Sequence, residues 1–426
     1  MSVRRRLGLR AAAVLLVVTA ALAATASAAW AARYSVALEG SPTVTQGRVG
    51  TPRSVTFAIT RAPATAPGSV SYSTMDGSAR GDAAGARAPV DYEAVSGRAA
   101  FAAGVDHVEV TVKLIGDDLY EPAQRFSLVI DHPQGDPAAD ALGDQRAGIT
   151  LLSSAPAPCQ AAPSAGDHPI VISVDGRLHR VLVHVPAGLD AGRHLPLLLA
   201  LHGLGADGPT MARYTGLSTL ADHDAFIVAY PSAERGQWHL YGSQVRAERD
   251  VDFLRATVDR LSSGLCVDRR RRFVAGVSNG AGEAARLACE MGDRLAGIAT
   301  VAGDYRRLPP CHPPRPESVL EIHGARDPVV PYEGRGPAHA GSIPKFLRMW
   351  RDIDGCREPG LHHRVDAYTE RSTWTCAGHT SVSQLKIANL GHAWPGAYPP
   401  PGRVPGPGSA AYALWSFFSS RGPRGH

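Results

Sequence analysis

The sequence predicts a multi-domain chain in which an all-β sandwich precedes an α/β domain with a mostly parallel sheet. Length is the first observation, because 426 residues exceed the size of one ordinary domain. The second is a change of pattern, since short alternating segments fill residues 33–152 whereas strand-like and helix-length segments alternate over residues 168–421. Between them lies a Pro-, Ala- and Ser-rich stretch, residues 153–167, which is typical of a linker.

The first 31 residues have the features of a Sec-type signal peptide and are excluded from the fold. Four arginines precede an apolar run over residues 11–24, which is short for a bilayer span, and Ala26-Ser27-Ala28 fits a cleavage site. No lipid-attachment cysteine lies near that site, because the first cysteine is Cys159. We therefore expect a secreted, extracellular protein with no membrane span after cleavage.

Residues 33–152 show the period-two alternation of an antiparallel β-sandwich. Gly, Asp and Pro separate the alternating segments, and no helical period intervenes. These segments are residues 54–59, 69–74, 108–114 and 126–130.

The turns of this first domain resemble those of Calx-β domains. The resemblance rests on Tyr72–Ala79, Asp91–Gly97, Asp117–Glu121, Phe101 and Phe126. It implies a β-sandwich that either binds calcium or is purely structural. Calcium prefers oxygen ligands, although carboxylates at strand ends are also ordinary turn residues. The candidate ligands are Glu39, Asp76, Asp91, Asp117, Asp118 and Glu121.

In the second domain, strands that alternate with helices predict a sheet covered on both faces. A hairpin is expected first, over residues 170–185. The other expected elements are strands at 195–201, 226–231 and 272–277, a helix at 248–261 and a last helix at 410–418.

The apolar strand at 272–277 runs directly into a G-x-S-x-G turn, and a helix-prone stretch follows. A sharp strand-to-helix turn exposes its serine, and glycines at 276 and 280 let neighbouring backbone pass close by. The pentapeptide alone is a weak signal in a chain with 45 glycines. In this context it predicts Ser278 as a nucleophile.

Two later strand ends supply the partners that such a serine needs. The strand-like segment 318–323 leads to Asp327, and the segment 385–390 leads to His392. A serine hydroxyl requires an imidazole base, which in turn requires a carboxylate. The chain order Ser, Asp, His is that of an α/β-hydrolase sheet. We therefore predict Ser278, His392 and Asp327 as nucleophile, base and orienting acid.

The loop after the strand at 195–201 is the expected oxyanion hole. It contains His202, Gly203 and Leu204, and glycine interrupts it. We predict that the backbone N–H groups of Leu204 and Asn279 bind the oxyanion. His202 is interpreted as a brace for this loop, because the triad already has a histidine.

Six cysteines in an exported chain suggest three disulfides. Loop lengths favour Cys289–Cys311 and Cys356–Cys376 and leave Cys159–Cys266, although other pairings are formally possible. No two cysteines have C-x-x-C spacing, which speaks against a metal site, and no cofactor is expected for catalysis.

The charge distribution gives no sign of a nucleic-acid partner. The net charge of +5 includes the signal-peptide arginines, and the basic run 269–272 is interpreted as a solvated loop. We expect a monomer.

The second domain resembles the secreted esterase family that includes polyhydroxybutyrate depolymerases, feruloyl esterases and acetylxylan esterases. The matching motifs include Leu201-His202-Gly203, Gly276–Gly280, His323-Gly324 with Asp327, and Gly391–Gly396. The resemblance implies a serine esterase that acts through the predicted triad and an acyl-enzyme. One departure concerns the pocket wall, because Ala281 and Gly282 stand where the family has glycine and methionine.

The substrate is not fixed by these motifs. Trp238 and Trp394 are candidates for contact with an acyl group or a polymer, and equally for loop anchors. The appended sandwich favours polymeric or polymer-linked esters: a polyhydroxyalkanoate, or feruloyl or acetyl esters of polysaccharides. A peptidase is less favoured, because no cap domain fits between the nucleophile and acid strands. The alternative of another class is a surface or adhesion protein that uses the hydrolase fold as a scaffold.

Overall fold

The computed structural model describes thirteen stretches of the chain: residues 33–46, 53–62, 66–77, 91–115, 123–134, 141–142, 145–153, 159, 164–188, 192–240, 243–305, 311–334 and 341–420. The predicted signal peptide and most of the predicted linker lie outside them. None of the helices in this part of the chain combines the length and the apolar character needed to cross a bilayer.

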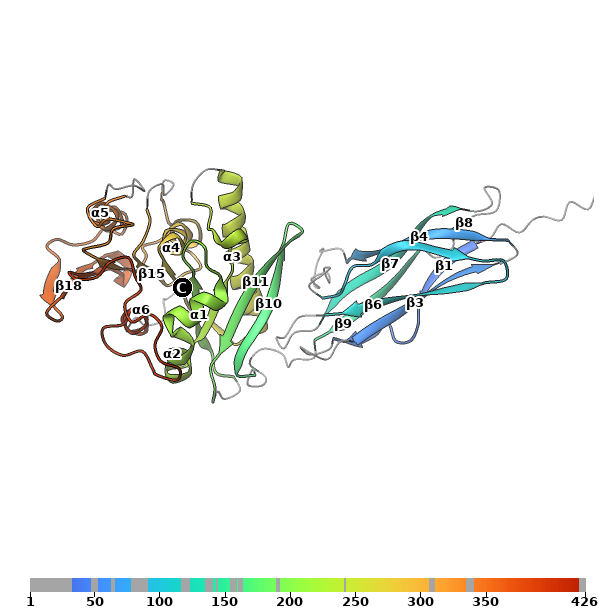
Figure 1. Ribbon diagram of the computed structural model, residues 1–426, viewed down its shortest axis with the longest axis horizontal. Coiled ribbons are helices and arrows are strands. Elements are labelled where there is room, and N and C mark those ends of the chain that lie inside the picture. Colours follow the sequence, from blue (N-terminus) through green and yellow to red (C-terminus); the bar gives the residue numbers. More distant parts are fainter. Residues whose placement is uncertain are drawn as a thin grey trace, which may run out of the picture.

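The first domain is a sandwich of two β-sheets (Figure 1). One sheet has the order β6-β3-β1-β8, formed by His107–Leu114, Arg53–Ala62, Arg33–Leu38 and Ala141–Leu142. The other has the order β2-β9-β7-β4-β5, formed by Thr43–Thr45, Arg146–Leu152, Gln124–Gln134, Gly68–Asp76 and Ser96–Phe101. The predicted all-β class is confirmed.

The alternation of buried and exposed residues along the strands explains how the two sheets form a shared core. Along β6, the buried residues Val110, Val112 and Leu114 alternate with exposed ones, so this strand gives one face to the core. Aromatic rings fill the space between the sheets, and Tyr92 stacks on Phe126 with ring centroids 4.0 Å apart.

The second domain is built on one sheet with the order β10-β11-β13-β12-β14-β15-β16-β19-β18-β17. The six strands from β13 to β19 pair in parallel, and antiparallel strands extend both edges. The mostly parallel sheet is therefore confirmed. The strands are β10 (Gly166–Val174), β11 (Arg177–Val185), β12 (Leu195–Leu201), β13 (Ile227–Pro231), β14 (Val267–Val277), β15 (Gly297–Val301), β16 (Val319–Gly324), β17 (Leu361–Arg364), β18 (Thr369–Thr375) and β19 (Ser381–Ile387).

Helices cover both faces of this sheet, which explains why its central strands are continuously apolar. Leu197, Leu199 and Leu201 of β12 join a core with α3, α4 and α5, whereas Leu198 and Ala200 join a core with α1, α2 and α6. The helices are α1 (Gly208–Thr215), α2 (Leu217–Asp224), α3 (Gln244–Gly264), α4 (Asn279–Met291), α5 (Ile343–Ile353) and α6 (Ala410–Ser419). The described residues also form two short 3-10 turns, Glu234–Gly236 and Ala377–His379.

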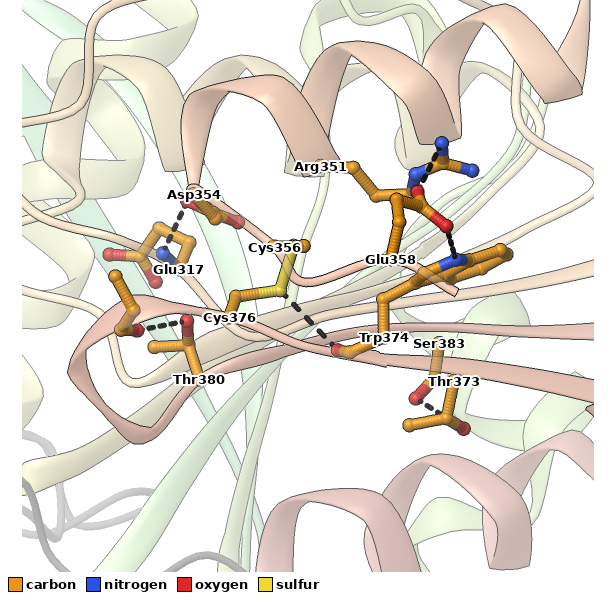
Figure 2. The surroundings of a disulfide bond; sticks show 11 residues. Glu317, Arg351, Asp354, Cys356, Glu358, Thr373, Trp374, Cys376, Thr380 and Ser383 are labelled. Atoms are coloured by element: carbon orange, nitrogen blue, oxygen red, sulfur yellow. Dashed lines mark hydrogen bonds and ion pairs between the residues drawn. A yellow bond between two sulfur atoms is a disulfide. The ribbon is translucent and has the colours of Figure 1, made fainter. Parts of the chain in front are cut away.

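Three disulfides join Cys159 to Cys266, Cys289 to Cys311, and Cys356 to Cys376, the same pairs that the sequence favoured. The last one ties the segment after α5 to the end of β18 (Figure 2). Beside it, Glu358 accepts a hydrogen bond from Trp374 at 3.2 Å and pairs with Arg351 at 2.6 Å. This corner is thus held by a covalent bond and a polar network.

We expect a disulfide that closes a longer loop to stabilise the fold more, with a gain that grows only as the logarithm of loop length. Cys289→Ala/Cys311→Ala opens a separation of 22 residues, and the free energy of unfolding should fall by about 3 kcal/mol. Cys356→Ala/Cys376→Ala is the matched control, with a separation of 20. Cys159→Ala/Cys266→Ala, at 107, should cost about 1 kcal/mol more. Urea unfolding of the three double variants measures this, and equal losses in all three would contradict the loop-entropy explanation.

Candidate active site

Ser278 occupies a strained turn between β14 and α4. Its backbone has φ 54° and ψ −116°, a region that residues other than glycine rarely adopt. Its N–H donates to the carbonyl of Val301 at 2.9 Å, which fixes the turn to the neighbouring strand. Strain of this kind, at a strand-to-helix turn, is the geometry of a nucleophile elbow.

Close backbone contacts explain the two glycines of the motif. A Cβ on Gly280 would collide with the carbonyl oxygens of Leu201 and His202, and a Cβ on Gly276 would collide with the carbonyl of Gly280. The end of β12 therefore crosses the start of α4 at a distance that no side chain permits.

The structure brings Ser278, His392 and Asp327 together. Nε2 of His392 lies 3.0 Å from Oγ of Ser278, and its Nδ1 lies 2.7 Å from Oδ2 of Asp327. The histidine comes from the loop after β19 and the aspartate from the loop after β16, so parallel neighbouring strands deliver both. The ring of His392 has the geometry to take a proton from Ser278 at Nε2 while Asp327 fixes its orientation through Nδ1.

Asp327 is built to remain ionised. Its Oδ1 accepts hydrogen bonds from the N–H groups of Val329 at 2.9 Å and Val330 at 2.8 Å. Burial opposes the charge, but hydrogen bonds from His323, His392 and Val330 outweigh it and hold the pKa of Asp327 well below its ordinary value. The side chain can therefore orient and stabilise a cationic His392.

The loop and the helix start that carry the two predicted oxyanion donors lie next to Ser278. A Cβ on Gly203 would stand 3.6 Å from Cβ of Ser278, so the loop that continues to Leu204 passes beside the nucleophile. Asn279 is the first residue of α4, where an N–H group has no partner within the helix. Its side chain exchanges hydrogen bonds of 2.8 and 3.0 Å with the backbone of Trp238, which fixes the position of that N–H.

His202 has the environment of a brace. It is fully buried, its Nδ1 lies 2.8 Å from the carbonyl of Gly203, and its Nε2 accepts from the N–H of Ala233 at 3.0 Å. Burial lowers the pKa of this ring, consistent with a neutral histidine that joins two loops.

The sequence left two roles open for Trp238 and Trp394, substrate contact and loop anchoring, and their burial favours loop anchoring. Their exposed fractions are 0% and 1%, so neither side chain reaches the surface. Trp238 donates from Nε1 to the carbonyl of His202 at 3.0 Å, and the N–H of Trp394 donates to the Tyr214 hydroxyl at 3.0 Å. Both tryptophans anchor loops of the site.

The calcium prediction is only partly covered by the structure. Asp117, Asp118 and Glu121 lie outside the described residues. Among the residues described, Glu39, Asp76 and Asp91 do not form a group with the spacing of metal ligands, and the one group that does contains the disulfide-bonded Cys159 and Cys266. Asp76 accepts from the Tyr92 hydroxyl at 2.7 Å, and Asp91 accepts from Gln46 at 3.4 Å.

Glu321 and Glu283 are among the buried carboxyl groups that the sequence reasoning missed. Glu321 of β16 is fully buried and receives hydrogen bonds from Thr300, Tyr305 and His323. Glu283 of α4 is also fully buried, and neither of its carboxyl oxygens has a hydrogen-bond partner among the described residues. The available signal was a charged residue inside an otherwise apolar run.

We expect Gly280→Ala to disrupt the elbow. The new methyl group collides with the carbonyls of Leu201 and His202, so unfolding free energy should fall by about 1–3 kcal/mol. Ser278 in the protein that still folds should react more slowly with a fluorophosphonate probe. The control is Gly406→Ala, where no atom lies within 4 Å of the added methyl. Unchanged labelling and stability in Gly280→Ala would contradict the crowded elbow.

Glu283 should make stability depend on pH. Burial, and secondarily the neighbouring Asp250, raise the pKa of Glu283 well above the ordinary value of 4.5. Because the pKa is higher in the folded state, the free energy of unfolding is highest below the ordinary pKa. It falls as pH rises from that value toward the folded-state pKa. Glu283→Gln should therefore gain in melting temperature relative to wild type as pH rises from about 4.5 to 8. Exposed Glu248→Gln is the control, and a pH-independent difference for Glu283→Gln would contradict the assignment.

Comparisons with known proteins identify relatives of both domains. The Calx-beta domain model matches residues 33–154. The chain is 31% identical to "Putative esterase NocK" of Nocardia uniformis subsp. tsuyamanensis, over 59% of this chain and 85% of the relative. It is 26% identical to "Feruloyl esterase B" of Piromyces equi, over 50% of this chain and 42% of that protein.

Solved structures include an acetyl xylan esterase from Aspergillus awamori, with 15% identity, a TM-score of 0.40, and coverage of 57% of this chain and 94% of that one. The chain spans most of NocK but less than half of feruloyl esterase B. The chain is therefore a carboxylic ester hydrolase that belongs to the same esterase family as NocK, and it carries a Calx-beta domain ahead of its catalytic domain.

Proposed function

We propose that the protein is a secreted serine esterase that works through an acyl-enzyme on Ser278. The observation that carries the proposal is the position of His392, with one ring nitrogen 3.0 Å from Oγ of Ser278 and the other 2.7 Å from Asp327. This arrangement supplies a base, an orienting acid and a nucleophile in one line. The described site contains every member of the triad, so the alternative of a non-catalytic scaffold has no support here.

In the proposed reaction, Oγ of Ser278 attacks the ester carbonyl while Nε2 of His392 takes its proton. Asp327 accepts the hydrogen bond from Nδ1 and stabilises the imidazolium that forms. The backbone N–H groups of Asn279 and Leu204 are proposed to bind the oxyanion. His392 then protonates the leaving alcohol. In the second half of the reaction, His392 takes a proton from water, the water attacks the acyl-enzyme, and His392 returns the proton to Oγ of Ser278.

The surroundings of the triad favour an apolar or polymeric ester. Large apolar side chains are exposed on the loops that carry the site: Leu204 at 67%, Val329 at 50% and Tyr398 at 65%. Leu204 directly follows Gly203, Val329 lies two residues after Asp327, and Tyr398 lies six residues after His392. Exposed apolar groups around a site are suited to a substrate that presents its own apolar surface. The names of its relatives favour feruloyl or acetyl esters of polysaccharides, and a polyhydroxyalkanoate remains an alternative.

Export is proposed from two features. The first 31 residues have the pattern of a signal peptide, and the three disulfides are of a kind that persists in oxidising environments. The Calx-beta domain is proposed to act as a spacer or adhesion module. A calcium site in that domain, and a monomeric state, remain predictions.

Ser278→Ala should abolish turnover without unfolding the protein. Loss of the nucleophile should lower kcat by about a thousandfold or more, because only binding and the oxyanion donors remain. Rates on p-nitrophenyl acetate, p-nitrophenyl butyrate, methyl ferulate and a polyhydroxybutyrate film should be compared with wild type, with circular dichroism as the folding check. The ranking of the wild-type rates selects the acyl group. Near-wild-type turnover in Ser278→Ala on any of these esters would falsify the mechanism.

A further inference from the structure

A buried polar chain lies behind the triad, inside the central sheet. Glu321 and His323 are two residues apart on β16, so their side chains lie on the same face of the sheet. Both are fully buried, and Nδ1 of His323 lies 2.9 Å from Oε1 of Glu321. The hydroxyls of Thr300 and Tyr305 donate to the other oxygen of Glu321. No step of the proposed reaction uses these groups.

The ring of His323 has acceptors at both nitrogens. Besides the contact with Glu321, its Nε2 lies 2.9 Å from the carbonyl of Val330 and 3.4 Å from Oδ2 of Asp327. A neutral imidazole has one N–H, so one of its nitrogens would then face an acceptor without a proton. An imidazolium satisfies both sides. A protonated Glu321 that donates to a neutral ring is the competing arrangement, and it leaves Asp327 without a cation.

We propose that His323 is held as an imidazolium between Glu321 and Asp327 and is a positioning residue for the triad. The proposal rests on the proposed function of Ser278, His392 and Asp327. His323 acts through Asp327, because Oδ2 of that aspartate lies 3.4 Å from Nε2 of His323 and 2.7 Å from Nδ1 of His392. One carboxylate oxygen is thus shared by two histidine rings.

The cation has two consequences for catalysis. It offsets part of the negative charge that Asp327 presents to the ring of His392, so the strength of His392 as a base depends on the charge of His323. It also donates to the carbonyl of Val330, whose N–H holds Oδ1 of Asp327 at 2.8 Å. The carboxylate is therefore fixed from the ring side and from the backbone side.

The charged and titratable neighbours of His323 agree with a cation. Burial disfavours the charge, but Asp327 and Glu321 outweigh it and raise the pKa of His323 to about 9. Tyr305 is buried against Glu321, and burial followed by that carboxylate raises the pKa of Tyr305, so its hydroxyl stays protonated as a donor. Tyr332 faces the ring edge-on at 6.0 Å, and Lys386 of β19 lies 4.1 Å from the centroid of Tyr332. Two carboxylates thus surround one imidazolium, with the lysine beyond Tyr332.

His323→Gln tests the charge through the pH profile. Without the cation, Asp327 presents its full negative charge to the ring of His392. The acid limb of kcat/KM should move up by about one pH unit, and the plateau should fall by about tenfold. The matched control is His179→Gln, which removes a buried ring that stacks on Phe253 at 4.1 Å. A lower plateau with an unmoved acid limb would reduce His323 to a packing role and overturn the proposal.

Glu321→Gln tests the other side of the cation. It removes the anion that holds the imidazolium and keeps an oxygen that can accept from Thr300 and Tyr305. Its amide N–H would then face Nδ1 of His323, so the ring should lose its second proton. The acid limb should therefore move up as it does in His323→Gln, and a profile that stays at that of wild type would contradict the charge argument.

Nitrogen-15 NMR of histidine-labelled protein reads the protonation state directly and needs no turnover. The chain has 17 histidines, and the signals lost in His323→Gln identify this ring. At about pH 7.5 both ring nitrogens of His323 should carry a proton, as the raised pKa requires. A single protonated nitrogen would overturn the proposal even in an active enzyme. Failure of the proposed function would instead appear as turnover that does not depend on Ser278, with the NMR result unaffected.

Discussion

The site depends on one close backbone crossing, where the end of β12 passes over the start of α4. Only glycine fits at position 280, because Leu201 and His202 place their carbonyls where a side chain would begin. That contact lets the 203–204 loop reach the nucleophile and holds Ser278 in its strained turn, with φ at 54°. The parallel sheet makes the crossing possible, since β12 and β14 are neighbours that end at the same edge.

The same edge assembles the other members of the triad. β16 and β19 pair in parallel, so the loops that follow them bring Asp327 and His392 together although 65 residues separate them in the chain. Their order along the sheet decides which loops can meet, whereas the loops decide what the site accepts. The sheet therefore defines the catalytic groups, whereas the loops determine which acyl group is accepted.

Much of the architecture could be predicted from the sequence, because each domain has a strong period and its strands end in recognisable turns. The triad followed from chain order and strand context. Trp238 and Trp394 were ambiguous since a tryptophan in a loop can face either the core or the solvent, and only packing shows that both are buried. The contact between Glu321 and His323 was missed, because a pattern that alternates polar and apolar residues does not reveal which polar groups meet inside the sheet.

The most direct test of the account is to trap the covalent intermediate. Wild-type enzyme mixed with p-nitrophenyl butyrate and quenched in acid within the first turnovers should carry a butyryl group on the peptide that contains Ser278, because acyl-enzyme formation releases the phenolate before water attacks. Mass spectrometry should find that adduct in wild type and not in Ser278→Ala. A butyryl group on another residue would contradict the account. So would the absence of any adduct when a burst of phenolate release shows that acylation is fast.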